Sequence, residues 1–185
     1  YPGAEKPALR NLSFSAAPGE ITAIIGGTGS GKSSLLKLIS RFYDTDSGSV
    51  LVDGINVKDI PVAELRKKIG LVPQKAVLFT GSVKENILFG NEQATEEEMI
   101  HAAKVAQAYD FVSEMKEGFD SMISQGGTNV SGGQKQRLSI ARALVRKPEI
   151  FLFDDSFSAL DFKTDAKLRA ALKEEINEAT VLIVA

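Results

Sequence analysis

The chain has 185 residues, of which 43% are hydrophobic and 25% are charged, and its formal net charge at pH 7 is −2. Such a composition is typical of a folded globular protein, and the length suits one domain or one core with appended subdomains. The acidic balance disfavours nucleic acid as a partner, because a broad basic face is what usually binds it. The absence of cysteine excludes disulfides and thiolate metal sites.

No apolar run approaches the roughly 18 residues that would span a bilayer, and the first residues do not form a signal peptide. The chain begins without Met and ends in an apolar run, 180–185, which is typical of a buried strand. We therefore expect residues 1–185 to be one domain that is trimmed at both ends from a longer polypeptide.

The first part of the chain predicts strands with two intervening helices. Apolar and polar residues alternate over 12–15, and loosely over 50–54, as in strands that are solvated on one face. The expected elements are strands within 9–25 and 48–57, helices over 33–42 and 63–68, and a strand over 69–73.

From about residue 79 to residue 147 the pattern is helical. Thr95 followed by Glu98 fits a capping box, and Ser131 opens a later helix. The continuous apolar run Ile150–Phe153 is typical of a central parallel strand that is buried on both faces. A charged helix over 165–178 and a strand over 180–184 complete the pattern. Strands that alternate with helices predict an α/β fold.

A glycine-rich segment between a predicted strand and a predicted helix fits G-x-x-x-x-G-K-[ST], and we call it the phosphate loop. Its glycines let successive N–H groups point at an anion, and the positive end of the following helix favours the same charge. Lys32 would reach the β and γ phosphates of ATP, and the Ser33 hydroxyl would hold Mg²⁺. The residues expected to bind the nucleotide here are Gly26, Gly27, Thr28, Gly29, Ser30, Gly31, Lys32, Ser33 and Ser34.

The apolar strand that begins at Ile150 ends in two acids, Asp154 and Asp155. Beside a phosphate loop, this is where a second Mg²⁺ anchor is expected, and Asp154 would hold the metal. The following acid, Asp155, would position or polarise the attacking water. Alone, such a pair is common in solvated turns; joined to the phosphate loop, it predicts a nucleotide site.

A second segment suited to an anion lies at the start of the helix that Ser131 opens. Ser131, Gly132, Gly133 and Gln134 offer N–H donors at a helix N-terminus. Alone, the segment would be a glycine-bearing helix cap. Because the chain already has one phosphate loop, a second anion site requires an explanation.

Five segments, in order, resemble the nucleotide-binding domain of an ATP-binding-cassette (ABC) transporter, over nearly the whole chain. The phosphate loop resembles the family's Walker A loop, and Ile150–Asp155 resembles its Walker B strand. Val72–Gln74 resembles its Q-loop, and Ser158–Asp161 resembles its D-loop. Val130–Gln134 resembles the LSGGQ signature, with Val in place of the usual Leu, and we call it the signature segment.

The resemblance implies an α/β P-loop NTPase: a RecA-like core with a mixed sheet, a small N-terminal antiparallel β subdomain, and an inserted helical subdomain. The core would comprise residues 1–76 and 141–185, and the helical subdomain residues 77–140. Two such domains are expected to form a head-to-tail dimer, homomeric or heteromeric. Each ATP would then lie between one phosphate loop and the other domain's signature segment. Ser131 and Gly133 would thus face the partner's γ-phosphate.

Two further site residues come from the resemblance. It gives Gln74 a contact with Mg²⁺ or the attacking water and a switching role, so that Gln74, Lys32 and Asp155 form the expected catalytic set. Tyr1 resembles the aromatic residue that stacks on adenine.

Residues 72–87 look like the exporter form of this domain. In exporters the domain usually follows membrane helices on the same polypeptide. The resemblance therefore implies a transmembrane domain as partner and a position at the cytoplasmic face of the cell membrane, with the domain itself soluble. ATP binding and hydrolysis would be coupled to export.

Two departures from the family pattern concern hydrolysis. The acid after Asp154 is usually Glu in the family but is Asp155 here. Aspartate is one methylene shorter, so its carboxylate would lie farther from the attacking water, and a displacement of about 1 Å can lower the rate about 10²-fold. The segment 123–127 also lacks the Glu common in exporters. Both favour one half of a heterodimeric exporter with a degenerate ATP site; an active homodimer that tolerates Asp is the alternative.

Other functions remain open at this point. One is a nucleotide-binding regulatory half with weak hydrolysis. Another is a soluble ABC ATPase that does not transport, which the acidic composition and the form of 72–87 disfavour. A P-loop kinase would leave Ser131–Gln134 and Ser158–Asp161 without a purpose.

Overall fold

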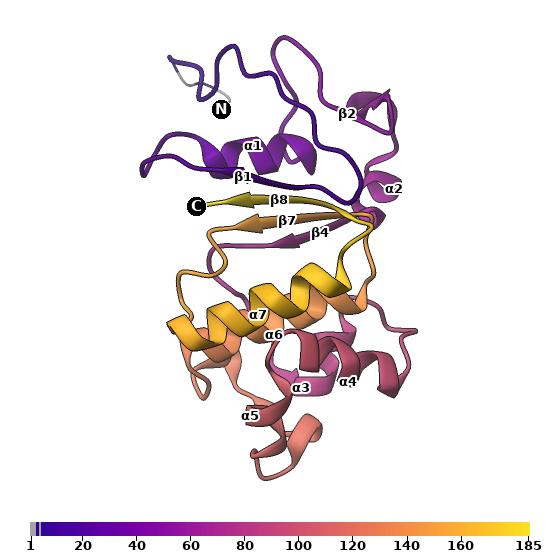
Figure 1. Ribbon diagram of the computed structural model, residues 1–185, viewed down its shortest axis with the longest axis vertical. Coiled ribbons are helices and arrows are strands. Elements are labelled where there is room, and N and C mark those ends of the chain that lie inside the picture. The colour runs from indigo at the N-terminus through magenta and orange to yellow at the C-terminus, as the bar shows by residue number, and fades with distance from the viewer. Residues whose placement is uncertain (1–2, 4) are drawn as a thin grey trace.

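The computed structural model describes residue 3 and residues 5–185 (Figure 1). Tyr1, which the resemblance assigned to adenine stacking, lies outside the described residues. The strands are β1 (Ile21–Ile24), β2 (Leu51–Val52), β3 (Ile55–Asn56), β4 (Ile69–Val72), β5 (Gly81–Ser82), β6 (Met122–Ile123), β7 (Ile150–Asp154) and β8 (Thr180–Val184). The α-helices are α1 (Lys32–Ile39), α2 (Val62–Lys67), α3 (Val83–Leu88), α4 (Glu96–Val105), α5 (Tyr109–Ser113), α6 (Gly132–Val145) and α7 (Phe162–Glu175). Short 3₁₀ helices are η1 (Val57–Asp59), η2 (Gly118–Asp120) and η3 (Gln125–Gly127).

The core sheet has the order β1-β8-β7-β4. The predicted α/β class is confirmed, but the sheet differs from the mixed one expected, because all its pairings in the described part of the chain are parallel. Helices lie between these strands in the sequence, and a helical crossover is what parallel neighbours need. The antiparallel component beside the core consists of the short pair β2-β3.

Strand β7 is buried on both faces, as its apolar run predicts. Phe151 and Phe153 pack in a hydrophobic cluster with residues of α3, α4, α6 and α7. Leu152, which points the other way, packs in a second cluster with residues of α1 and α2. In Figure 1, α6 and α7 accordingly lie below the sheet and α1 lies above it. The alternation of side chains along one strand therefore joins two separate cores.

Two of the expected elements differ from those in the structure. The strand expected around 12–15 does not form, and Leu12 and Phe14 remain about half exposed, whereas the strand expected just before the phosphate loop is present as β1. Alternation at 12–15 shows that a segment can form a strand but does not supply a neighbouring strand with which to pair. The charged helix begins at Phe162 rather than 165, because Asp161 caps it by accepting a hydrogen bond from the Thr164 amide at 2.9 Å.

Residues 79–147 are mainly helical, as predicted. The capping box of Thr95 and Glu98 is present at the start of α4, and Ser131 caps α6. The antiparallel pair β5-β6 was not predicted. Its strands contain two residues each, which is too short to show a periodicity in the sequence.

We predict that Leu152→Ala lowers the free energy of unfolding by about 2–5 kcal/mol, because Leu152 is fully buried at the centre of the sheet. Urea denaturation measures this change. Phe162→Ala is the control, since Phe162 is 90% exposed, and its effect should stay within about 0.5 kcal/mol. Equal effects of the two substitutions would contradict the assignment of Leu152 to the core.

Candidate functional site

The phosphate loop connects the carboxyl end of β1 to α1. Gly31 is the N-cap residue of α1 in a left-handed conformation, with φ of 95°. A Cβ at this position would lie 3.0 Å from the Ala8 carbonyl oxygen, so both the conformation and the close approach require glycine. Because Gly31 has no side chain, it makes no capping hydrogen bond to the first turn of α1. The helix thus presents first-turn N–H groups to a ligand at its positive end.

Lys32 lies back along the same loop. Its ammonium donates hydrogen bonds to the carbonyl oxygens of Gly26 and Gly27, the latter at 3.0 Å. The positive charge is therefore held at the loop itself, close to the N–H groups of the first turn. This is the position from which a lysine can neutralise the phosphates of a nucleotide.

Ser33 and Asp154 come together from distant parts of the chain. The Ser33 hydroxyl, in the first turn of α1, donates a hydrogen bond of 2.8 Å to Asp154 Oδ1 at the end of β7. Hydroxyl and carboxylate oxygens are ligands that Mg²⁺ prefers, and Mg²⁺ usually takes few protein ligands together with phosphates and water. The pair therefore fits the predicted metal role.

Asp155 and Gln74 form the next contact along this edge. The Gln74 amide nitrogen donates to Asp155 Oδ2 at 3.0 Å. Asp155 has a positive φ of 44°, and its backbone N–H donates to the Val184 carbonyl at 2.9 Å. The structure thus places Gln74 on the acid that would act on water. The sequence predicted both residues but not their contact.

The signature segment begins α6. Ser131 and Gln134 form a capping box: the Gln134 amide donates to Ser131 Oγ at 3.2 Å, and the Ser131 amide donates to Gln134 Oε1 at 2.8 Å. A Cβ on Gly133 would lie 3.2 Å from the Ala159 carbonyl oxygen, whereas nothing lies within 4 Å of one on Gly132. The segment thus packs on its own D-loop through Gly133 and is open at Gly132.

The D-loop ends at Asp161, the N-cap residue of α7. Asp161 accepts hydrogen bonds from the hydroxyl and the amide of Thr164 at 2.6 and 2.9 Å. These two bonds hold the pKa of the Asp161 carboxyl below its usual value, and the bond from the hydroxyl has the larger effect. The carboxylate therefore remains charged and keeps the D-loop fixed to the helix that follows it.

Two buried polar residues near the site were missed at the level of sequence. Ser156 Oγ donates to the Val72 carbonyl at 2.8 Å, and Gln136 Nε2 donates to the Pro73 carbonyl at 3.0 Å. Both side chains are buried, and they hold the backbone just before Gln74. The sequence shows that these residues are polar, but it does not show that they are buried.

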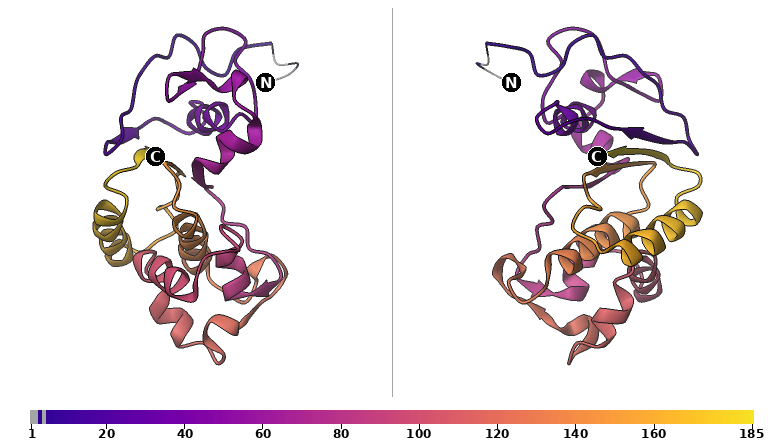
Figure 2. Two further views of the ribbon diagram at one scale, coloured as in Figure 1. Left: turned by 90° about the vertical axis from the view of Figure 1, so that its right-hand side faces the viewer. Right: turned by 60° about the vertical axis from the view of Figure 1, so that its left-hand side comes forward.

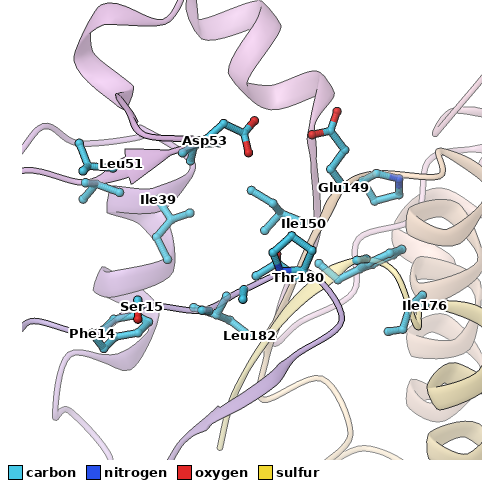
Figure 3. A pocket seen from close by; sticks show the side chains of 18 of the residues that line it. Phe14, Ser15, Ile39, Leu51, Asp53, Glu149, Ile150, Ile176, Thr180 and Leu182 are labelled. Atoms are coloured by element: carbon cyan, nitrogen blue, oxygen red, sulfur yellow. The ribbon is translucent and has the colours of Figure 1, made fainter.

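A cavity of about 1120 Å³ lies at the amino ends of the core strands (Figure 3). Its walls include Glu149 and Ile150 at the start of β7 and Thr180 at the start of β8, with Phe14 and Leu51 opposite. Ligands of parallel α/β sheets bind at the carboxyl ends of the strands, where the phosphate loop lies. This cavity is therefore separate from the candidate site.

Comparisons with known proteins agree with this geometry. The family model described as ABC transporter matches residues 9–158. An ABC transporter ATP-binding protein of Bacillus subtilis, itself uncharacterized, is 54% identical over 172 residues, which are 93% of this chain and 30% of the relative. A Staphylococcus aureus protein named as a candidate multidrug export ATP-binding/permease protein is 45% identical over 185 residues, which are 100% of this chain and 32% of the relative.

A solved structure is similar throughout. A bacterial Atm1-family ABC exporter with ATP bound superposes with a TM-score of 0.96 at 37% identity, covering 100% of this chain and 33% of the exporter chain. The chain belongs to the ABC transporter family and is a nucleotide-binding domain of exporter type. It spans about a third of the length of the relatives it matches. No helix among the residues that the structure describes is long and apolar enough to cross a bilayer.

We predict that Lys32→Ala weakens MgATP binding by about 10- to 100-fold, because a hydrogen bond to a charged group is worth roughly 1.5–3 kcal/mol. Titration calorimetry measures the dissociation constant. Lys37→Ala is the matched control, since Lys37 is an exposed lysine in the last turn of the same helix. Unchanged affinity in Lys32→Ala would show that the loop does not hold the phosphates.

Proposed function

We propose that this chain binds MgATP and, in a head-to-tail dimer with a second domain of its kind, couples ATP binding and hydrolysis to export through a transmembrane domain of the same polypeptide. The domain would lie at the cytoplasmic face of the membrane. The observation that carries this proposal is the convergence of the phosphate loop, Asp154, Asp155 and Gln74 at the carboxyl edge of one sheet.

The geometry supports distinct chemical roles. The N–H groups of the phosphate loop and Lys32 would bind and orient the triphosphate, while Ser33 and Asp154 would hold Mg²⁺. Bound Mg²⁺ would neutralise charge that develops on the phosphate oxygens. The Asp155 carboxylate would position the attacking water and accept its proton, and the Gln74 amide would fix the direction of that carboxylate.

Two anion-binding helix ends on one chain support the dimer. Residues of α1 and α6 pack in the separate clusters on opposite faces of the sheet. The rotated views in Figure 2 also show the two layers on either side of the sheet. In a head-to-tail dimer, the phosphate loop at α1 would hold one ATP and the signature segment at α6 would close over the other.

An exposed apolar patch supports contact with a transmembrane domain. Val77, Phe79 and Phe89 are 59%, 45% and 62% exposed, and the two phenylalanine rings lie 4.7 Å apart by their centroids. Exposed patches of this kind mark interaction surfaces. The patch follows Gln74 in sequence, within the proposed helical subdomain of residues 77–140. The exporter class of the chain and the greater length of its relatives agree with such a partner.

Weak hydrolysis at this chain's own phosphate loop is a second candidate function. Asp155 is one methylene shorter than the Glu that the family usually has, and in the structure its carboxylate is engaged by Gln74. A chain of this kind would bind ATP mainly for regulation and would complete the partner's site with its signature segment.

We predict that Asp155→Glu raises ATP turnover of the intact dimer about tenfold, because the longer side chain places the carboxylate closer to the water. Phosphate release at saturating MgATP measures the rate. Asp155→Asn is the control that removes the base. If Asp155→Glu changes nothing and Asp155→Asn abolishes turnover, the aspartate is fully competent and the degenerate-site interpretation is wrong.

The dimer gives a separate prediction at Gly132. Because nothing lies within 4 Å of a Cβ there, Gly132→Asp should keep the fold but place a negative charge against the partner's nucleotide. ATP-dependent dimerisation should be lost. Light scattering measures it under conditions in which ATP hydrolysis is slow. Ser113→Asp adds the same charge at an exposed position of α5 and should leave dimerisation intact. Dimerisation by both variants would refute the head-to-tail arrangement.

A further inference from the structure

The backbone leaves the core sheet at Val72 and Pro73, and two side chains from other segments hold these consecutive carbonyl groups. Ser156, which follows Asp154 and Asp155 in sequence, donates to the Val72 carbonyl at 2.8 Å. Gln136, on α6, donates to the Pro73 carbonyl at 3.0 Å. Proline has no N–H, so its carbonyl is the one backbone polar group through which its position can be fixed.

Gln136 is 2% exposed, which is unusual for an amide side chain. Burial of an amide costs free energy unless it is hydrogen-bonded, and an apolar side chain would fill the same space without that cost. Packing alone therefore does not account for a glutamine at this position. The bond to Pro73 does, because it pairs the buried Nε2 donor with the Pro73 carbonyl.

The other faces of α6 are attached to the helical segments. Arg137 donates to the Gln107 carbonyl at 2.7 Å, and Arg142 donates to the Asn86 carbonyl at 2.8 Å. Helix α6 is thus fixed to the segments around α3 and α4. Of the two consecutive carbonyls, that of Val72 is held by the core, whereas that of Pro73 is held by α6.

We propose that Gln136 is a positioning residue that couples the signature segment to Gln74. Ser131 and Gln136 share one helix, Gln136 holds Pro73, and Gln74 follows Pro73 and contacts Asp155. A displacement of α6 at its capped end therefore moves the amide that orients Asp155. This link rests on the proposed dimer. Through it, hydrolysis of the nucleotide at a chain's own phosphate loop depends on the nucleotide that the signature segment of the same chain contacts.

The test is steady-state ATP turnover by the intact protein with Gln136→Met, which keeps the length of the side chain and removes the donor. We expect kcat to fall about tenfold, while KM for ATP stays within about twofold, because the phosphate loop is unchanged. Ser121→Ala is the control: it removes another buried polar side chain, which accepts a bond from the Glu117 amide, and should leave kcat unchanged. Melting temperatures confirm that all variants are folded.

Two further variants separate positioning from packing. In Gln136→Glu, the introduced carboxyl can donate to Pro73 only when protonated, and burial raises the pKa of such a group. Its turnover relative to wild type should therefore recover as the pH falls. In a Gln74→Ala background, Gln136→Met should cause no further loss, since both act through one contact.

The outcomes are distinct. Wild-type kcat in folded Gln136→Met, or losses that multiply in the double variant, would overturn the inference and leave the proposed function intact. Absence of ATP turnover in the wild-type protein would overturn the proposed function and this inference together.

Discussion

The parallel pairing of β7 with β8 on one side and β4 on the other is the constraint on which the site depends. In this register Phe153 lies opposite Val72 on β4, and Asp154 lies opposite Val184 on β8. Residues that follow β4 therefore emerge beside residues that follow β7, which is how Gln74 meets Asp155. The packing of α1 on the same sheet then brings Ser33 to Asp154.

The same sheet separates the two helix ends that can hold an anion. A phosphate binds best where several N–H donors converge in a dry site, and in the proposed dimer each of the two helix ends would supply part of those donors. Residues of α1 and α6 pack on opposite faces of the sheet. The two halves of each proposed nucleotide site would therefore come from different chains. In the proposed head-to-tail dimer, a second domain of the same kind would supply the other donors, and the nucleotide would form part of the interface between the two domains.

The sequence predicted which segments form the candidate site, but not the contacts that join them. Local patterns predicted the phosphate loop, the two acids and the signature segment, because glycine spacing, a helix start and a strand end each involve neighbouring residues. The contacts of Gln74 with Asp155 and of Gln136 with Pro73 join residues far apart in the chain, and no local pattern encodes such a pairing. For the same reason, alternation at Leu12 and Phe14 predicted a strand without a partner to complete it.

The capping box at Ser131 has a consequence for the free-energy cost of forming the proposed dimer. Its hydroxyl oxygen already accepts a bond from the Gln134 amide, so the side chain is held in one rotamer before anything approaches. The hydroxyl hydrogen remains able to turn towards an incoming oxyanion. Little side-chain entropy would then be lost on forming the proposed dimer, because the Ser131 rotamer is already fixed in the folded domain.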